Sequence, residues 1–448
     1  MDFTPSARSQ ALLARLQGFL REEVLPAEEG YFQELRAAGS GGDWRRWRVP
    51  AVLETLKARA RELGLWNLFL PDDELGAGLS PLEYAPLAEA MGWSLIAPEV
   101  TNCNAPDSGN MEVLYHYGSP EQKRRWLEPL LAGRIRSVFC MTEPDVASSD
   151  ATNLEATIRQ DGDELVLDGK KWWATGLGHP EARLALFLGL SNPEADRHHR
   201  HSLVLVPLDA PGVTVRRMLA VFGDYDPPAG HGEVRFENVR VPRENLVLGL
   251  GRGFEIAQGR LGPGRIHHSM RAIGAAERAL ELLIRRGLER TAFGKPLIEL
   301  DGNRERVAEL RMAIDQARLL TLYAAWKLGE LGPHGAMVEI SAIKVVAPNV
   351  LQRVVDEAIQ LHGGAGLSQD GPLAALFGLA RALRLADGPD AVHRALIARA
   401  ELARYRRGSR ARRAATKPGP SARARSSLSS GWMPGSGRGS PVSAARRR

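Results

Sequence analysis

The sequence predicts an α+β protein in which two helical regions flank a β region. From about residue 8 to 137, apolar residues recur every three or four positions, as they do on the buried face of a helix. Between 138 and 243, short apolar runs alternate with turn residues, which is typical of strands, and helical spacing then returns. We therefore expect domains at 1–137, 138–243 and 244–405, followed by a tail at 406–448.

The first region has both helical periodicity and a helix-start signal. Leu12, Leu16 and Leu20 are spaced to lie on one helical face. Ser119 is followed by Pro120, and serine caps a helix well while proline is tolerated at the first helical position. These residues predict a helix that starts after Ser119.

The middle region predicts a small β domain. The expected strands are 164–167, 184–190, 202–207 and 234–242. Asp168-Gly169 has the composition of a two-residue hairpin turn, because both central positions of a type I′ turn need positive φ. We therefore expect the chain to reverse direction at Asp168-Gly169.

The third region predicts an antiparallel bundle of long amphipathic helices. Apolar residues three and four positions apart define helices at 271–289, 304–330, 336–361 and 389–405.

The basic charge of the chain is concentrated in the tail. Residues 406–448 contain twelve Arg or Lys and no Asp or Glu; since the whole chain carries +6, the residues before 406 carry a net −6. The tail is poor in aliphatic residues, so we expect it to be disordered. It is either an inert extension or an arm for an acidic partner such as nucleic acid, and the acidic body makes nucleic acid an unfavourable partner.

The sequence lacks the features of membrane-spanning, secreted, disulfide-rich and zinc-binding proteins. The sequence has no apolar run of about 18 residues and no secretory signal, so we expect a cytoplasmic protein without a membrane anchor. The only cysteines, Cys103 and Cys140, suggest neither a disulfide framework nor a zinc site, and we expect no metal.

Two motifs in the middle region are specific. They are Phe-Cys-Met-Thr-Glu-Pro at 139–144 and Gly-Lys-Lys-Trp-Trp-Ala-Thr-Gly at 169–176. Both resemble the acyl-CoA dehydrogenase family, and the match extends over about 8–405. The resemblance implies an N-terminal helical domain, a middle β-barrel-like domain, a C-terminal four-helix bundle and an FAD cofactor.

The same motifs supply the groups that a flavin needs. A flavin requires hydrogen-bond donors at its pyrimidine edge and an aromatic wall near N5, and Thr142, Trp173 and Thr175 match these roles. The resemblance places Ser148 near the cofactor pyrophosphate or the CoA arm. The loop is one residue longer than the family pattern, so Ser149 remains an alternative. The cofactor contacts implied for this region are Phe139, Met141, Thr142, Ser148, Trp173 and Thr175.

Two further motifs lie in the third region. Arg-Thr-Ala-Phe-Gly at 290–294 and Gln-Leu-His-Gly-Gly-Ala-Gly at 360–366 resemble family elements that reach the FAD of a neighbouring subunit. Arginine can bind a pyrophosphate with two hydrogen bonds, and glycines let the backbone approach a ligand closely. The implied contacts are Arg290, Phe293, Gln360, Gly363 and Gly364. They imply a homo-oligomer, either a dimer or a tetramer.

The candidate catalytic base is Asp387, which the resemblance places just before the last helix, next to Gly388 at the substrate. The alternative is a capping role, because an Asp before Gly-Pro and a helix is an ordinary N-terminal cap. The segment 260–268 resembles a branch of the family that uses an Asp base and, in animals, is fused to a kinase-like module. In that branch, Arg265 would anchor the base region by hydrogen bonding.

The resemblance implies desaturation of an acyl-CoA thioester to the trans-2-enoyl-CoA. Asp387 would take the α proton, flavin N5 would take the β hydride, and an electron-transferring flavoprotein would accept the electrons. Two alternatives remain: a flavin oxidase of the nitroalkane-oxidase type, and a flavin-bearing relative that binds nucleic acid. Fold alone does not separate these functions. The sequence does not fix acyl length or substituents.

Overall fold

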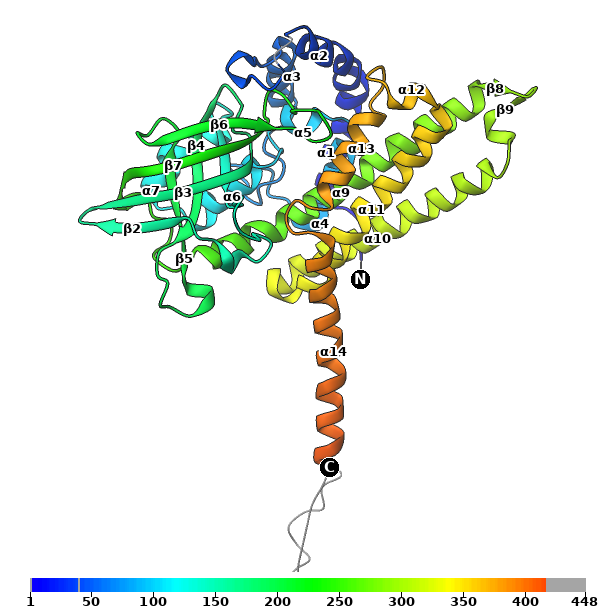
Figure 1. Cartoon of the computed structure of the whole chain (residues 1–448). Coiled ribbons are helices and arrows are strands. Elements are labelled where there is room, and N and C mark those ends of the chain that lie inside the picture. Colours follow the sequence, from blue (N-terminus) through cyan, green and yellow to red (C-terminus); the bar gives the residue numbers. More distant parts are fainter. Residues whose placement is uncertain (1, 39–40, 416–448) are drawn as a thin grey trace, which may run out of the picture. The chain divides into compact units, whose positions relative to one another are not determined.

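The structure is a computed structural model that describes residues 2–38 and 41–415, with side chains described up to residue 406. The chain up to Arg399 forms one compact unit, and the part from Ala400 onward is a separate unit described by itself. Along the chain, a set of helices is followed by a β-sheet and then by a set of long helices (Figure 1). This order confirms the predicted α+β class.

The helices before the sheet form the N-terminal region. Ser119 accepts a hydrogen bond from the Gln122 N–H, which confirms the predicted helix start, and helical structure continues to Leu131. The helices are α1 (Ala7–Phe19), α2 (Leu25–Ala37), α3 (Ala51–Glu62), α4 (Pro81–Met91), α5 (Ala97–Val100), α6 (Asp107–Tyr117), α7 (Pro120–Gln122) and α8 (Glu128–Leu131).

The middle region is one seven-stranded sheet with its own apolar core. The strand order is β1-β4-β2-β3-β7-β6, and β5 pairs with β4. Its strands are β1 (Arg136–Cys140), β2 (Thr157–Asp161), β3 (Glu164–Thr175), β4 (Ala182–Leu190), β5 (His201–Pro207), β6 (Val213–Leu219) and β7 (His231–Pro242).

The predicted turn at Asp168-Gly169 is wrong. The chain reverses between β2 and β3 at Gly162, which has φ +62°, and β3 continues through Asp168-Gly169 to Thr175. The register of β3 with β7 shifts between Leu167 and Gly169, so the pair forms a bulge. A Cβ on Gly169 would lie 2.4 Å from the Ala156 Cβ. The glycine therefore permits close approach of a neighbouring segment.

Three of the four helices predicted after the sheet are longer than predicted, and α11 has the predicted length. α9 starts well before the predicted residue 271, α13 was not predicted, and α14 continues past the predicted end at 405. The tail predicted to be disordered from 406 is thus helical up to Ala415, and 416–448 lies outside the described residues. The elements are α9 (Gly253–Glu289), the short hairpin β8 (Thr291–Ala292) and β9 (Lys295–Pro296), α10 (Asn303–Gly335), α11 (Met337–His362), α12 (Gly364–Leu367), α13 (Leu373–Leu383) and α14 (Asp390–Ala415).

The helices before and after the sheet share one apolar core. Residues of α4 and residues of α9, α10 and α11 belong to the same buried cluster. Where α4 crosses α9, a Cβ on Gly274 would lie 1.9 Å from the Glu89 carbonyl oxygen, and one on Gly92 would lie 2.1 Å from the Arg271 carbonyl oxygen. The two backbones are therefore in direct contact, which fixes the position of α9.

Within 2–38 and 41–415, no helix is both long enough and apolar enough to span a bilayer. The same residues contain no group of three His, Cys, Asp or Glu side chains able to hold a metal ion. Cys103 and Cys140 are both buried and unpaired.

Candidate active site

The segment after β1 leaves the sheet beside β3. The Trp172 N–H donates to the Thr142 carbonyl oxygen at 3.0 Å, which ties the segment to β3. Phe139, Met141 and Thr142 are half-buried, so each retains exposed surface at this edge of the sheet.

A buried ion pair anchors this segment. Lys171 Nζ lies 2.7 Å from a Glu143 carboxylate oxygen, and both side chains are almost fully buried. The Glu143 carboxylate also accepts the backbone N–H groups of Glu155 and Ala156. Burial lowers the pKa of Lys171, although the Glu143 charge opposes the shift. Because both charges are paired and hydrogen-bonded, the pair fixes the path of 141–143 against β3.

Trp173 and Thr175 are set by a second bulge in β3. The register with β7 shifts between Lys171 and Ala174, and Trp173 has φ +51°. The Trp173 side chain is 42% exposed, so the bulge leaves a large aromatic surface uncovered. Thr175 Oγ1 lies 3.0 Å from His231 Nδ1, and the two rings of Trp173 and His231 are 5.8 Å apart.

Ser148 closes the loop that follows Glu143. Its hydroxyl accepts the Glu143 N–H at 2.8 Å and lies 3.3 Å from the Glu143 and Val146 carbonyl oxygens. The serine therefore shapes the 143–148 loop. A contact of Ser148 or Ser149 with a ligand stays a prediction.

Asp387 lies in the turn between α13 and α14 with φ +55°. Its carbonyl oxygen accepts two hydrogen bonds from Arg265, at 3.2 Å from Nε and 3.1 Å from Nη2, and lies 3.2 Å from His393 Nε2. The next residue, Gly388, has φ +102°. In the described part of the chain, no α14 backbone N–H donates to the Asp387 carboxylate. Its side chain therefore does not cap α14.

The Asp387 carboxylate lies among positive side chains. Burial alone would raise the pKa of Asp387, but the imidazole of His268 and the positive charges of Arg260, Arg265 and Lys344 lower it below its ordinary value. Burial also lowers the pKa of Lys344, to about 8. Asp387 is therefore ionised at neutral pH.

Arg260 links this turn to the β region. Its Nε donates to Asn110 Oδ1 at 3.0 Å, and its guanidinium carbon is 4.1 Å from the centre of the Phe139 ring. The same guanidinium acts electrostatically on Asp387. One arginine therefore joins Phe139, in the flavin motif of the sequence, to the candidate base.

The motifs at 290–294 and 360–366 lie together, but far from Asp387. A Cβ added to Gly287, near the end of α9, would lie 3.2 Å from Leu361 Cδ2 of α11, so the two helices lie close together there. Arg290 follows the last residue of α9, and at 1.5 Å per residue it is roughly 37 Å along the helix from Arg265. Figure 1 shows β8 and β9 at the end of α9 opposite the sheet. Within one chain, the residues predicted for these motifs, which are Arg290, Phe293, Gln360, Gly363 and Gly364, do not join the site around Asp387.

Several residues of the site were not predicted from the sequence, among them Glu143, Lys171 and His268. Glu143 and Lys171 lie inside the two flavin motifs, but only the structure shows that they pair. His268 lies within the segment 260–268, and its distance to Asp387 depends on how α9 packs against the turn before α14. For the Lys171–Glu143 pair, the sequence offered one signal, which is that each motif contains a charged residue.

Comparisons with known proteins agree with this architecture. Family models for the acyl-CoA dehydrogenase N-terminal, middle and C-terminal domains match residues 6–134, 138–239 and 251–402. Mouse "acyl-CoA dehydrogenase family member 11" is 52% identical over 89% of this chain, but the match spans only 51% of that protein. The chain thus covers about half the length of such animal relatives.

Shorter relatives match over their whole length. "Probable acyl-CoA dehydrogenase FadE2" of Mycobacterium tuberculosis is 51% identical over 90% of this chain and 98% of its own. A solved structure described as "a putative acyl-CoA dehydrogenase from Mycobacterium abscessus" is 62% identical, with a TM-score of 0.87, and covers 90% of this chain and 100% of its own. The family models together span most of the chain and the described fold has the same order of domains, so the chain belongs to the acyl-CoA dehydrogenase family.

Proposed function

We propose that the protein catalyses FAD-dependent α,β-dehydrogenation of an acyl-CoA thioester, with Asp387 as the base that removes the α proton. The observation that carries this proposal is the state of the Asp387 carboxylate. It is largely buried, its pKa is lowered by the surrounding cations, and within the described chain no hydrogen bond of 3.5 Å or less occupies it. A general base must be ionised and must keep an oxygen free for the proton it removes.

The backbone around Asp387 supports the same role. Arg265 holds the Asp387 carbonyl oxygen, and in the described part of the chain the Asp387 N–H has no acceptor. A free N–H beside the base is suited to the thioester carbonyl, where it would stabilise the negative charge that develops as the α proton leaves. Arg265 acts here as a positioning residue, because it fixes the peptide that carries both groups.

The middle region provides groups that fit a flavin. Trp173 presents an exposed ring, and Thr175 presents a hydroxyl held by His231. Met141 and Thr142, in the motif at 139–144, are half-buried. The buried Nε1 of Trp172 has no partner in the described chain, so a donor in this region is unsatisfied. When bound, FAD supplies N5 as the acceptor of the β hydride. Phe139, Met141, Thr142, Ser148, Trp173 and Thr175 would hold it.

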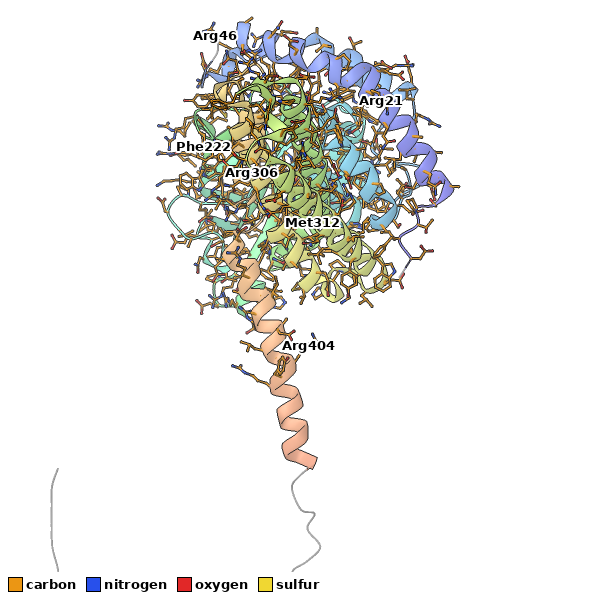
Figure 2. The ribbon with its side chains drawn as sticks, turned by 90° about the vertical axis from the view of Figure 1, so that its right-hand side faces the viewer. Arg21, Arg46, Phe222, Arg306, Met312 and Arg404 are labelled. Carbon is orange, nitrogen blue, oxygen red and sulfur yellow. The ribbon has the colours of Figure 1, made fainter. Side chains whose placement is uncertain are left out.

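A second subunit would complete the cofactor site. Arg290 and the glycines at 363 and 364 are exposed, and Phe293 is 95% exposed. Met312 and Leu319 expose 55% and 57% on one face of α10, where Figure 2 shows Met312 at the surface. Apolar side chains exposed in this way are typical of a surface that another chain covers. We infer a two-fold dimer, alone or paired into a tetramer.

The decisive experiment is an anaerobic titration of the FAD-loaded protein with saturated acyl-CoAs. The set should vary in chain length and include 4-hydroxy and 4-phospho forms. Bleaching of the flavin by at least one thioester is expected, followed by rapid reoxidation by an electron-transferring flavoprotein and slow reoxidation by oxygen. Rapid reoxidation by oxygen together with bleaching by a nitroalkane would indicate an oxidase. A protein that takes up no FAD would overturn the proposal.

A further inference from the structure

His268 is the polar side chain closest to the Asp387 carboxylate. It lies on α9, and its Nε2 is 3.6 Å from Asp387 Oδ2. It is one turn from Arg265, which holds the carbonyl oxygen of the same aspartate. Two residues of one helix therefore contact the backbone and the side chain of Asp387 separately.

The tautomer of His268 follows from its second contact. Arg271 Nη2 lies 3.2 Å from His268 Nδ1. A guanidinium has donors only, so Nδ1 must be the acceptor in this contact. A neutral imidazole with an acceptor at Nδ1 carries its proton on Nε2, which is the nitrogen that faces Asp387.

The surroundings keep this imidazole neutral. Burial and the positive charge of Arg271 lower the pKa of His268 to about 3, although the Asp387 charge opposes the shift. Positive side chains outnumber negative ones near His268 and Asp387, so a further positive charge on the ring is unfavourable. The charged or titratable groups that face this pair are Arg260, Arg265 and Arg271 of α9, Lys344 of α11, and Asp390 and His393 of α14. His267 adjoins His268 in the chain and interacts electrostatically with His268, but it is not among the groups that shift the pKa of Asp387.

We propose that His268 is a positioning residue for the base, and that its Nε2–H directs one oxygen of Asp387 and leaves the other free for the α proton. This inference rests on the proposed role of Asp387. The separation of 3.6 Å is longer than an ordinary hydrogen bond, and contacts of this kind often shorten when the substrate binds. Because the donor favours the carboxylate over the carboxylic acid, it also keeps the base ionised in mildly acidic solution.

Two substitutions separate the donor from the rest of the side chain. His268→Asn keeps an acceptor near Arg271 but does not reach Asp387, whereas His268→Gln places an amide N–H at about the position of Nε2. In rapid-mixing measurements of flavin reduction, we expect His268→Asn to be slower by about 10- to 100-fold. We also expect the acid limb of its pH profile to move to higher pH. His268→Gln should recover most of the rate and of the profile.

The neighbouring residue provides a matched control. His267 is buried on the same helix with its ring 4.8 Å from that of Tyr84, and it is not among the groups that shift the pKa of Asp387, so His267→Gln should leave the acid limb where it is. A His268→Asn variant with the wild-type rate and pH profile would overturn the inference. If Asp387→Asn also reduces at the wild-type rate, the proposed base is wrong. If only the His268 variants are normal, the positioning role alone is wrong.

A measurement without turnover tests the tautomer directly. The protein labelled with ¹⁵N-histidine should show a neutral ring with a protonated Nε2 for His268 between pH 8 and 5, assigned by the loss of its signal in His268→Gln. A ring protonated on Nδ1, or charged at pH 7, contradicts the inference even if the Asn variant fails to fold.

Discussion

Asp387 has separate roles for its backbone and its side chain. Arg265 and His393 hold its carbonyl oxygen, and its φ of +55° turns the N–H and the carboxylate away from α14. Asp and Asn are among the residues that tolerate this left-handed conformation. Asp387 can therefore be replaced by Asn without disturbing the turn.

Asp387→Asn is expected to keep the fold, the bound flavin and acyl-CoA affinity, and to slow flavin reduction by about 10²- to 10⁴-fold, as expected when a general base is removed. Asp387→Glu adds a methylene and displaces the carboxylate, so it should recover only part of the rate. Stopped-flow bleaching with a good substrate measures both variants. Reduction by the Asn variant at the wild-type rate would remove Asp387 from the mechanism.

Glu112 of α6 is a second buried acid near Arg260. Its protonation state in the folded protein can be tested through the pH dependence of stability. Burial raises its pKa to about 8, although Arg260 opposes the shift, and its Oε2 has no partner in the described chain. The folded state thus keeps a proton that the unfolded chain loses above its ordinary pKa of 4.5. The contribution of Glu112 to the free energy of unfolding is therefore full below pH 4.5, and it decreases as the pH rises to about 8.

Glu112→Gln should therefore be increasingly more stable than wild type as the pH rises from 5 to 8, by at most about 5 kcal/mol. Thermal unfolding across this pH range measures the difference. The exposed Glu121→Gln should show no such trend. An equal stability difference for Glu112→Gln at pH 5 and pH 8 would mean that Glu112 is ionised in the folded protein.

At the scale of single residues, the sequence motifs identify candidate cofactor-binding side chains, but not the residues that hold those side chains in place. Trp173 and Thr175 could be named because their types match a flavin. The positive φ of Trp173 and the contact between Thr175 and His231 depend on a strand bulge, and the residue types of this segment do not predict that bulge. His268 was missed for the same reason, since its partner is more than a hundred residues away along the chain.

At the scale of elements, α9 packs directly against the backbone of α4 at Gly274. Gly274→Ala would place a Cβ 1.9 Å from a backbone oxygen of α4, so the two helices must separate. We expect a loss of stability of several kcal/mol, which is typical of overpacking against a backbone that cannot move. Denaturant unfolding measures it.

Gly329→Ala on α10 is the matched control. No atom outside the adjoining backbone of its own helix lies within 4 Å of its added Cβ, so this variant should be more stable by about 0.5–1 kcal/mol, because alanine favours a helix over glycine. Equal effects of the two substitutions would mean that α4 and α9 are not in close contact.

The start of α9 also explains why its length was underestimated. Gly259, Gly262, Pro263 and Gly264 all disfavour a helix, so the sequence places its start at residue 271. In the fold, a Cβ on Gly259 would lie 2.3 Å from the Tyr117 hydroxyl, so this glycine serves helix packing. Tertiary contacts override local preference both here and at Asp168-Gly169, where the glycine fits a bulge.

At the scale of the whole molecule, the cofactor site is expected to need two chains. Arg290→Gln should leave the oligomer intact and weaken FAD binding by about 10- to 100-fold, because a hydrogen bond to a charged group contributes about 1.5–3 kcal/mol. Phe293→Asp should weaken the oligomer itself. Arg285→Gln, an exposed arginine about one turn earlier, is the control. Light scattering and flavin fluorescence measure both effects, and an FAD-loaded monomer at micromolar concentration would contradict the expectation.

The shared core of the helices before and after the sheet also determines the order in which the chain can fold during synthesis. The apolar face of α4 is covered by α9 and α10, and the ribosome makes the whole sheet before either of them. Domains usually fold in turn as they emerge, but here the first helices have no complete core until the last ones appear. The sheet has a separate core and can therefore fold before α9 and α10 are made. The nascent chain therefore exposes apolar helices for the time needed to translate the β region, and these helices are where a chaperone would bind.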